Sequence, residues 1–268
     1  TNGGDLDNRN GALQATGALA ASAVGKLSNG HGRIEAGSGR NTATLSLDAA
    51  SLDNSAGRVA NAAQGATTLN LHGGALTNTA GTLGGQGDVT ASAGAIGNTG
   101  SGTVVAGRDL NLTAASLDNT SGTLYAARNL AWVNQLASLT NRQGHLGAGG
   151  NTVLTLAALD NSSGETAANS NVTLTLGSLV GSGRVVAGND LALTLADNYT
   201  NLAGNTLKAN RNASLTFSGN LDNASGATLS AVGALAVKAT AITNSGTVDS
   251  AATSLTVTGA LANSGRIE

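Results

Sequence analysis

Apolar residues alternate with polar ones along most of the chain, at positions i and i+2. Leu110 and Leu112 flank Asn111, and the same Leu-x-Leu arrangement returns at 154–156 and 174–176. Successive side chains of a β-strand point to opposite faces, so this spacing predicts strands with one buried face. Leu and Ala favour helices by propensity. However, the apolar residues do not recur at i+3 and i+4, and Gly or Asn ends each run before a helix of ordinary length could form.

These alternating pieces belong to an internal repeat that is marked by the phrase Leu-x-Asn-x-x-Gly. The thirteen closing glycines enclose twelve intervals that cover 254 residues, about 21 residues each. Near residue 180 the phrase shrinks to Leu179-Val180-Gly181-Ser182-Gly183 and loses its asparagine, which predicts a bend or an extra loop, as do the longer intervals between residues 32 and 81. The recurring asparagines are Asn8, Asn29, Asn54, Asn78, Asn98, Asn119, Asn141, Asn161, Asn201, Asn223, Asn244 and Asn263. The closing glycines are Gly11, Gly32, Gly57, Gly81, Gly102, Gly122, Gly144, Gly164, Gly183, Gly204, Gly226, Gly246 and Gly265.

Three short strands and three corners per repeat are typical of one coil of a parallel β-helix. We therefore expect an all-β solenoid of about 13 coils that spans residues 1–268 as a single segment. Coils would stack at the strand spacing of ~4.8 Å, giving a rod on the order of 60 Å long. One coil of small aliphatic residues cannot offset the entropy of ordering its own chain, so stability requires neighbouring coils. A leucine-rich repeat fits less well, because the asparagine here follows a single Leu-x.

The recurring turn residues suggest specific roles. Asparagine tolerates left-handed backbone conformations and bonds its own turn, and stacked Asn side chains can bond along a column. We expect the closing glycines to supply corners with positive φ. Aspartates that recur at one turn position indicate turn chemistry rather than the paired acids of a glycoside hydrolase. These aspartates are Asp7, Asp53, Asp118, Asp160 and Asp222.

Composition removes several classes of function. Pro, Cys and Met are absent, so no disulfide or cysteine-ligated metal site is possible. A net charge of −2 provides no basic patch for nucleic acid. The apolar runs are too short to span a bilayer. The first residues lack the basic and apolar stretches of a secretory signal, so we expect either a cytosolic protein or an internal fragment of a longer one.

No residue stands out as catalytic, cofactor-binding or metal-ligating. The histidines are His31, His72 and His145, and His145 falls in an outward column whose chemistry changes from coil to coil, as on a solvated face. Residues 84–88 resemble a calcium-binding nonapeptide, but they occur once, whereas such motifs work in tandem. We therefore expect no enzymatic activity and no cofactor.

Two further surface features are considered. The outward position of Leu-x-Leu forms a Thr-rich column that could bind a regular lattice, although Thr also suits any exposed strand. Among the aromatic residues, Trp132, Tyr199 and Phe217 take core positions and Tyr125 points outward. The members of the Thr-rich column are Ser46, Asn70, Asn111, Thr155, Thr175, Thr194, Thr216 and Thr256.

The segments Leu117-Asp118-Asn119-Thr120-Ser121-Gly122-Thr123-Leu124 and Gly107-Arg108-Asp109-Leu110-Asn111-Leu112-Thr113-Ala114 resemble the filamentous haemagglutinin repeat. The similarity extends over nearly the whole chain. It implies two-partner-secretion exoproteins of Gram-negative bacteria, which include adhesins and contact-dependent growth-inhibition effectors. In these proteins the repeats form a right-handed β-helical filament that is secreted through an outer-membrane transporter.

The resemblance and the repeat together predict a structural shaft, secreted or displayed on the cell surface, that projects a receptor-binding or toxin region. A target-cell receptor or glycan would then be bound through other regions. The open ends of the segment should expose unpaired strand edges, which would permit end-to-end stacking. The alternatives are a carbohydrate-binding or carbohydrate-active β-helix, and a lattice-binding Thr face.

Overall fold

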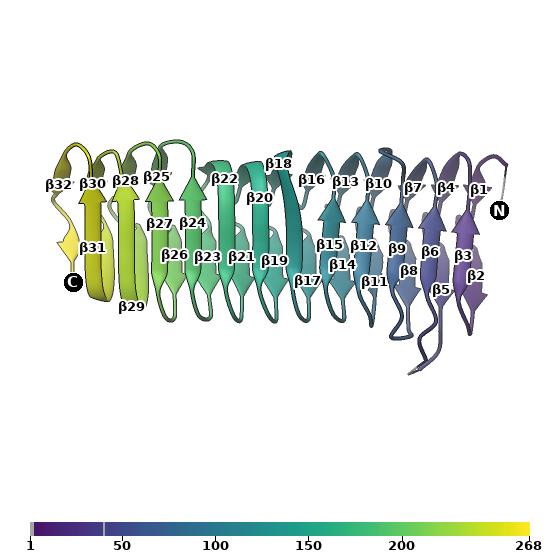
Figure 1. Ribbon diagram of the computed structural model, residues 1–268. Coiled ribbons are helices and arrows are strands. Elements are labelled where there is room, and N and C mark those ends of the chain that lie inside the picture. The colour runs from purple at the N-terminus through teal and green to yellow at the C-terminus, as the bar shows by residue number, and fades with distance from the viewer. Residues whose placement is uncertain (1–2, 40) are drawn as a thin grey trace.

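The structure is a computed structural model that describes residues 3–39 and 41–268. The chain is a parallel β-solenoid of about 12 turns, each of roughly 21 residues, with the termini at opposite ends of the stack (Figure 1). The repeat type predicted from the sequence is confirmed. The predicted number of 13 coils is one too high, because thirteen closing glycines enclose twelve intervals. The described part of the chain contains no helix, and none therefore that could cross a membrane.

Each turn contributes one strand segment to each of three parallel faces. The first face consists of β2 (Ala12–Ala15), β5 (Arg33–Ala36), β8 (Arg58–Asn61), β11 (Thr82–Gly85), β14 (Thr103–Ala106), β17 (Thr123–Ala126), β19 (His145–Ala148), β21 (Glu165–Ala168), β23 (Arg184–Ala187), β26 (Thr206–Ala209), the start of β29 (Thr228–Ala239), the start of β31 (Thr247–Val257) and β33 (Arg266–Ile267).

The second face adjoins the first across a polar or glycine corner. It consists of β3 (Leu19–Ser22), β6 (Leu45–Asp48), β9 (Thr67–Asn70), β12 (Val89–Ser92), β15 (Leu110–Thr113), the starts of β18 (Leu130–Thr140), β20 (Thr152–Asp160) and β22 (Val172–Val180), then β24 (Leu191–Leu195), β27 (Ala213–Phe217) and the ends of β29 and β31.

The third face carries the Leu-x-Asn phrase. It consists of β1 (Leu6–Asp7), β4 (Lys26–Ser28), β7 (Ser51–Asp53), β10 (Ala75–Thr77), β13 (Ala95–Gly97), β16 (Ser116–Asp118) and the ends of β18, β20 and β22. A separate four-stranded ladder continues it with β25 (Tyr199–Asn201), β28 (Leu221–Asn223), β30 (Ile242–Asn244) and β32 (Leu261–Asn263).

The inward side chains of the three faces form one continuous core of Leu, Val, Ile and Ala. Trp132 and Phe217 are buried within it, and the buried ring of Tyr199 stacks on that of Phe217 with the ring centroids 5.6 Å apart. These three aromatic residues were predicted to take core positions, and they do. Burial of such large rings offsets part of the entropy of ordering chains that are otherwise built from small residues.

A ladder of buried asparagines runs beside this core, where each coil leaves the third face. The Nδ2 of Asn29 donates to Oδ1 of Asn54 at 2.7 Å and to the backbone carbonyl of Arg58 at 3.2 Å. The same side-chain bond joins consecutive members from Asn8 to Asn161, and again from Asn201 to Asn263. Because each amide both donates and accepts, a polar column can be buried without leaving its members unsatisfied.

The glycines that close the phrase are required for a reason other than the positive φ expected from the sequence. A Cβ on Gly57 would lie 2.2 Å from the backbone oxygen of Asn29, in the coil before it. Positive φ belongs instead to the preceding residue, which is Ala56 at 51°. That residue is glycine in only part of the stack, since Asn10, His31, Ala80, Ser101, Ser121, Gln143 and Ser163 also adopt this conformation.

Two glycines of the predicted column lie out of line with the others. Thr206 and Thr228 pair in register on the first face, so the residues that precede them are Asn205 and Ala227. The turns that contain Gly204 and Gly226 are one residue longer than the standard turn. These two glycines therefore supply the positive φ of their turns, at 84° and 81°, rather than the close approach.

The irregular phrase near Gly181 breaks the third face, as the sequence suggested. Val180 ends β22, Tyr199 begins the separate ladder, and the asparagine ladder stops at Asn161. The hydroxyl of Tyr199 donates to Oδ1 of Asn201 at 3.3 Å, and Nδ2 of Asn205 donates to the carbonyl of Gly181 at 2.9 Å. Burial raises the pKa of Tyr199, so its hydroxyl remains a donor.

The longer intervals between residues 32 and 81 also have a structural counterpart. The connection from β5 to β6 extends beyond the corners of its neighbours (Figure 1). Residue 40, which belongs to this connection, lies outside the described residues.

The asparagine ladder should carry much of the stability of the stack. Asn119→Ala removes the donor that serves Asn141 and the carbonyl of Gly122, and the acceptor that serves Asn98. We expect a loss of about 1–3 kcal/mol for each buried group left unpaired. The measurement is the chemical denaturation midpoint followed by circular dichroism. Asn111→Ala, at an exposed position on the second face, is the control and should shift the midpoint little. Equal shifts would contradict the role of the ladder.

The close approach at the column glycines can be tested in the same way. Gly57→Ala forces a methyl group against the Asn29 carbonyl, so we expect a loss of roughly 1–3 kcal/mol or more. Gly17→Ala is the control, since no atom lies within 4 Å of its built Cβ. A thermal unfolding experiment in which both variants match the parent chain would show that the contact is not limiting.

Candidate functional site: a polar hollow on the first face

The residue that follows the close-approach position starts each strand of the first face and points outward. The strand register aligns these residues in one column along the rod, and their chemistry changes from coil to coil, as predicted for a solvated face. The column contains Ala12, Arg33, Arg58, Thr82, Thr103, Thr123, His145, Glu165, Arg184, Thr206, Thr228, Thr247 and Arg266.

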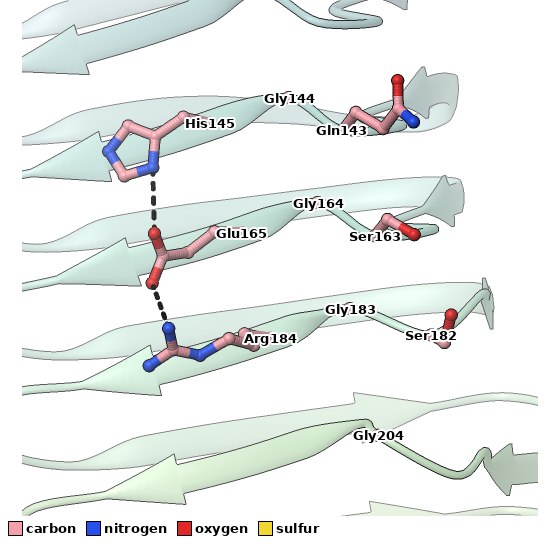
Figure 2. A pocket seen from close by; sticks show the side chains of 10 residues that line it. All are labelled: Gln143, Gly144, His145, Ser163, Gly164, Glu165, Ser182, Gly183, Arg184 and Gly204. Carbon is pink, nitrogen blue, oxygen red and sulfur yellow. Dashed lines mark ion pairs between the residues drawn. The ribbon is translucent and has the colours of Figure 1, made fainter.

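Three consecutive members of this column form a charged row across β19, β21 and β23 (Figure 2). Nδ1 of His145 lies 3.2 Å from Oε2 of Glu165, and Nη1 of Arg184 lies 3.7 Å from Oε1 of the same carboxylate. All three side chains remain partly exposed, and that of Arg184 is 61% exposed. Ion pairs this open to water contribute little to stability, so their side chains are available for other contacts.

A hollow of about 490 Å³ lies beside this row. Its floor consists of Gly144, Gly164 and Gly183, where the coils approach too closely to admit side chains. The opposite wall carries the turn residues that precede these glycines, and Gly204 lies at one end. Those turn residues are Gln143, Ser163 and Ser182 (Figure 2). The hollow is thus polar on both sides and runs across consecutive coils.

Tyr125 lies on the same face, in the coil before His145. It pairs in register with Gly147, where a built Cβ would lie 3.2 Å from Cδ2 of Tyr125 and 2.8 Å from Nε2 of His145. Both rings therefore border a position that has no side chain. The tyrosine is 36% exposed, as expected from the sequence, and its ring is open to solvent near the hollow.

The recurring aspartates of the third face are located at turns. Oδ1 of Asp53 accepts from the backbone N–H of Ser55 at 3.1 Å and from its hydroxyl at 2.7 Å. The hydrogen bond from the Ser55 hydroxyl lowers the pKa of Asp53. Asp118 and Asp160 make the same pair of bonds to the residue two positions on, and Asp7 accepts from the backbone of Arg9. These carboxylates fix turns and lie in different coils.

A second ladder, at the corner before the second face, was missed in the sequence. Oδ1 of Asn151 accepts from the backbone N–H of Asn171 at 3.2 Å and from its Nδ2 at 3.0 Å. The signal was available, because an Asx residue precedes the first apolar residue of the second strand in coil after coil. The members are Asp88, Asp109, Asn129, Asn151, Asn171, Asp190 and Asn212.

Arginines neutralise two of the acidic members of this second ladder. Hydrogen bonding from Arg128 lowers the pKa of Asp109, and hydrogen bonding from Arg211 lowers that of Asp190. Asp88, the last residue of the stretch that resembled a calcium motif, accepts from the backbone N–H of Asp109 at 3.1 Å. Its carboxylate therefore joins one coil to the next.

The histidines lie in separate coils. His31 occupies a turn with φ of 55°, and Nε2 of His72 lies 3.0 Å from Oδ1 of Asp48. Across residues 3–39 and 41–268, no three or more His, Asp and Glu side chains are grouped so that they could hold a metal ion.

The Thr-rich column expected on the second face is split between two registers. Thr155, Thr175, Thr194 and Thr216 pair directly with one another. Ser46 and Asn111 instead pair with Thr68 and Thr90, in the column two residues earlier along the strand. The Leu-x-Leu pieces were superimposed on their leucines, but those leucines occupy different inward positions in different coils. A regular row of threonines therefore extends over four coils only.

Comparison with known proteins agrees with this geometry. The family model described as "Haemagglutinin repeat" matches residues 82–131, 131–194 and 172–266, which together cover more than half of the chain. A segment of 96 residues is 38% identical to the "tRNA nuclease CdiA-2" of Burkholderia pseudomallei (strain 1026b). That match covers 33% of this chain and 3% of the relative. No solved structure matches. The chain belongs to the haemagglutinin repeat family.

Proposed function

We propose that this chain is a length of structural shaft within a much longer filamentous exoprotein, either an adhesin or a contact-dependent inhibition protein. The shaft is secreted, exposed at the surface of a Gram-negative cell, and holds a receptor-binding or toxin region away from that cell. The observation that carries the proposal is the unbroken core that runs through about 12 stacked turns. Such a stack gains length with each repeat while its cross-section stays constant.

The relative's name gives the cargo that such a shaft could carry. That protein is named a tRNA nuclease, and the match covers 3% of it. In the described residues of this chain, the recurrent carboxylates fix turns and the outward polar residues change identity from coil to coil. We therefore assign any toxin activity to other regions of the parent protein and a spacer role to this segment.

Export through an outer-membrane transporter suits a chain of this construction. Each coil pairs with its immediate neighbours, about 21 residues away, so contacts form between segments that are close in sequence. Such a chain can fold coil by coil as it emerges, because each new coil finds a preformed edge on which to pair. No cysteine is present that could lock the chain before passage.

The terminal coils leave core positions uncovered. Leu261 and Ile267 are 49% and 38% exposed at one end, and Leu6 and Leu13 are only partly buried at the other. We infer that further coils of the parent protein cover these ends, and that isolated segments can stack end to end through them. Contact with a target-cell receptor or glycan is assigned mainly to other regions of the parent.

The shaft hypothesis predicts the shape of the isolated chain. Twelve coils at ~4.8 Å should give a β-rich rod on the order of 60 Å long in small-angle scattering and far-ultraviolet circular dichroism. End-to-end stacking would lengthen this rod in steps that depend on protein concentration. A compact, globular scattering profile at low concentration would overturn both the shaft and its function.

A spacer should also tolerate the loss of whole coils. Deletion of residues 103–144 joins Gly102 to His145 and keeps every column in register. We expect the variant to stay folded and the rod to shorten by about 10 Å. Deletion of residues 103–133 is the control, because it places second-face residues after a first-face corner and should abolish cooperative unfolding. If both deletions behaved alike, the modular shaft would be ruled out.

A further inference from the structure

The hollow between residues 143 and 184 has walls of opposite origin in each coil it crosses. One wall carries His145, Glu165 and Arg184, which start strands of the first face (Figure 2). The other carries side chains of the preceding turns. Its floor cannot fill with side chains, because a Cβ on Gly164 would lie 2.0 Å from the backbone oxygen of Asn141. The groove is therefore fixed by the coil geometry and needs no rearrangement to admit a ligand.

The charge of this hollow restricts what it can hold. Glu165 lies between His145 and Arg184 and is within 4 Å of both, so the row has little net charge near neutral pH. A polyanion such as nucleic acid requires several uncompensated cations, and this row does not provide them. The walls are polar rather than apolar, which disfavours a lipid or an apolar peptide.

The hydrogen-bonding groups favour a ligand that is rich in hydroxyls. Arg184 offers donors, Glu165 offers acceptors, and Gln143, Ser163 and Ser182 offer both. Each of three consecutive coils thus presents a polar group on both sides of the same groove. A linear chain that repeats a hydroxylated unit along the rod axis could meet this pattern in coil after coil.

The rings of Tyr125 and His145 add a second recognition element. Both border the bare backbone at Gly147, and the tyrosine ring is partly open to solvent. The face of an aromatic ring carries partial negative charge and attracts the polarised C–H groups of a sugar ring. An aromatic surface beside a groove of planar polar side chains is suited to a saccharide, which has both an apolar face and an edge of hydroxyls.

We propose that this hollow, together with Tyr125, binds a neutral oligosaccharide lying along the rod axis. This inference is independent of the shaft function, because a spacer needs no ligand. The site would give one stretch of the filament a weak and repeatable contact with a neutral glycan surface, in addition to any receptor bound elsewhere.

The experiment is a titration of the 268-residue chain with cellotetraose, xylotetraose, mannotetraose and maltotetraose, followed by saturation-transfer and chemical-shift changes in NMR spectra. We expect at least one of these to bind, with an affinity that changes little as the salt concentration rises. Tyr125→Ala and Arg184→Ala should each weaken binding by roughly tenfold or more, whereas Tyr125→Phe should retain it. Thermal unfolding would verify that each variant is folded.

Arg58→Ala is the matched control. Arg58 occupies the same outward column, and its Nε donates to Oε1 of Glu35 at 2.8 Å, but it lies outside the hollow. Its replacement should leave oligosaccharide binding unchanged. The proposal is overturned if no tetrasaccharide binds at millimolar concentration, if Tyr125→Ala and Arg184→Ala bind as the parent does, or if only a sulfated polysaccharide binds in a salt-sensitive way. The first of these results would leave the rod and its spacer role intact.

Discussion

The close stacking of one coil on the next is the constraint on which the rest of this structure depends. At the corner after the third face, a buried Asn amide bonds to the next Asn, while the following glycine lies against the carbonyl of the coil before it. Buried amides in a low-dielectric core are costly unless paired, so the ladder fixes the register of neighbouring coils. That register aligns the core leucines and the outward columns together.

This constraint explains why part of the structure could be predicted from the sequence. Asparagine and leucine at fixed offsets over many repeats leave few alternatives for which side chains point inward. The burial of Trp132, Tyr199 and Phe217 followed from their place in the repeat. The role of glycine was misjudged, since a sequence shows that glycine recurs but does not distinguish a positive φ from a contact with a carbonyl of another coil.

The outward surface was harder to predict because it depends on register. Superimposing Leu-x-Leu pieces placed Ser46 and Thr155 in one column, although the structure puts them in different ones. The ladder from Asp88 to Asn212 escaped notice because Asp and Asn alternate along it, and both can accept a backbone N–H. His145 was correctly placed outward, but its proximity to Glu165, Arg184 and Tyr125 follows only from the pairing of their strands.

The irregular coil and the hollow have a common origin. From Gly181 to Gly183 the turn is one residue shorter than in the coils before it, and the turn that ends at Asn205 is one residue longer. Ser182 is therefore half-buried where Gln143 and Ser163 are exposed, which deepens the groove at that coil. Loss of the ladder asparagine is offset by Tyr199, whose ring fills the core and whose hydroxyl bonds Asn201. A repeat that tolerates such exceptions can place a binding surface at one point of a shaft without interrupting the core that holds the shaft together.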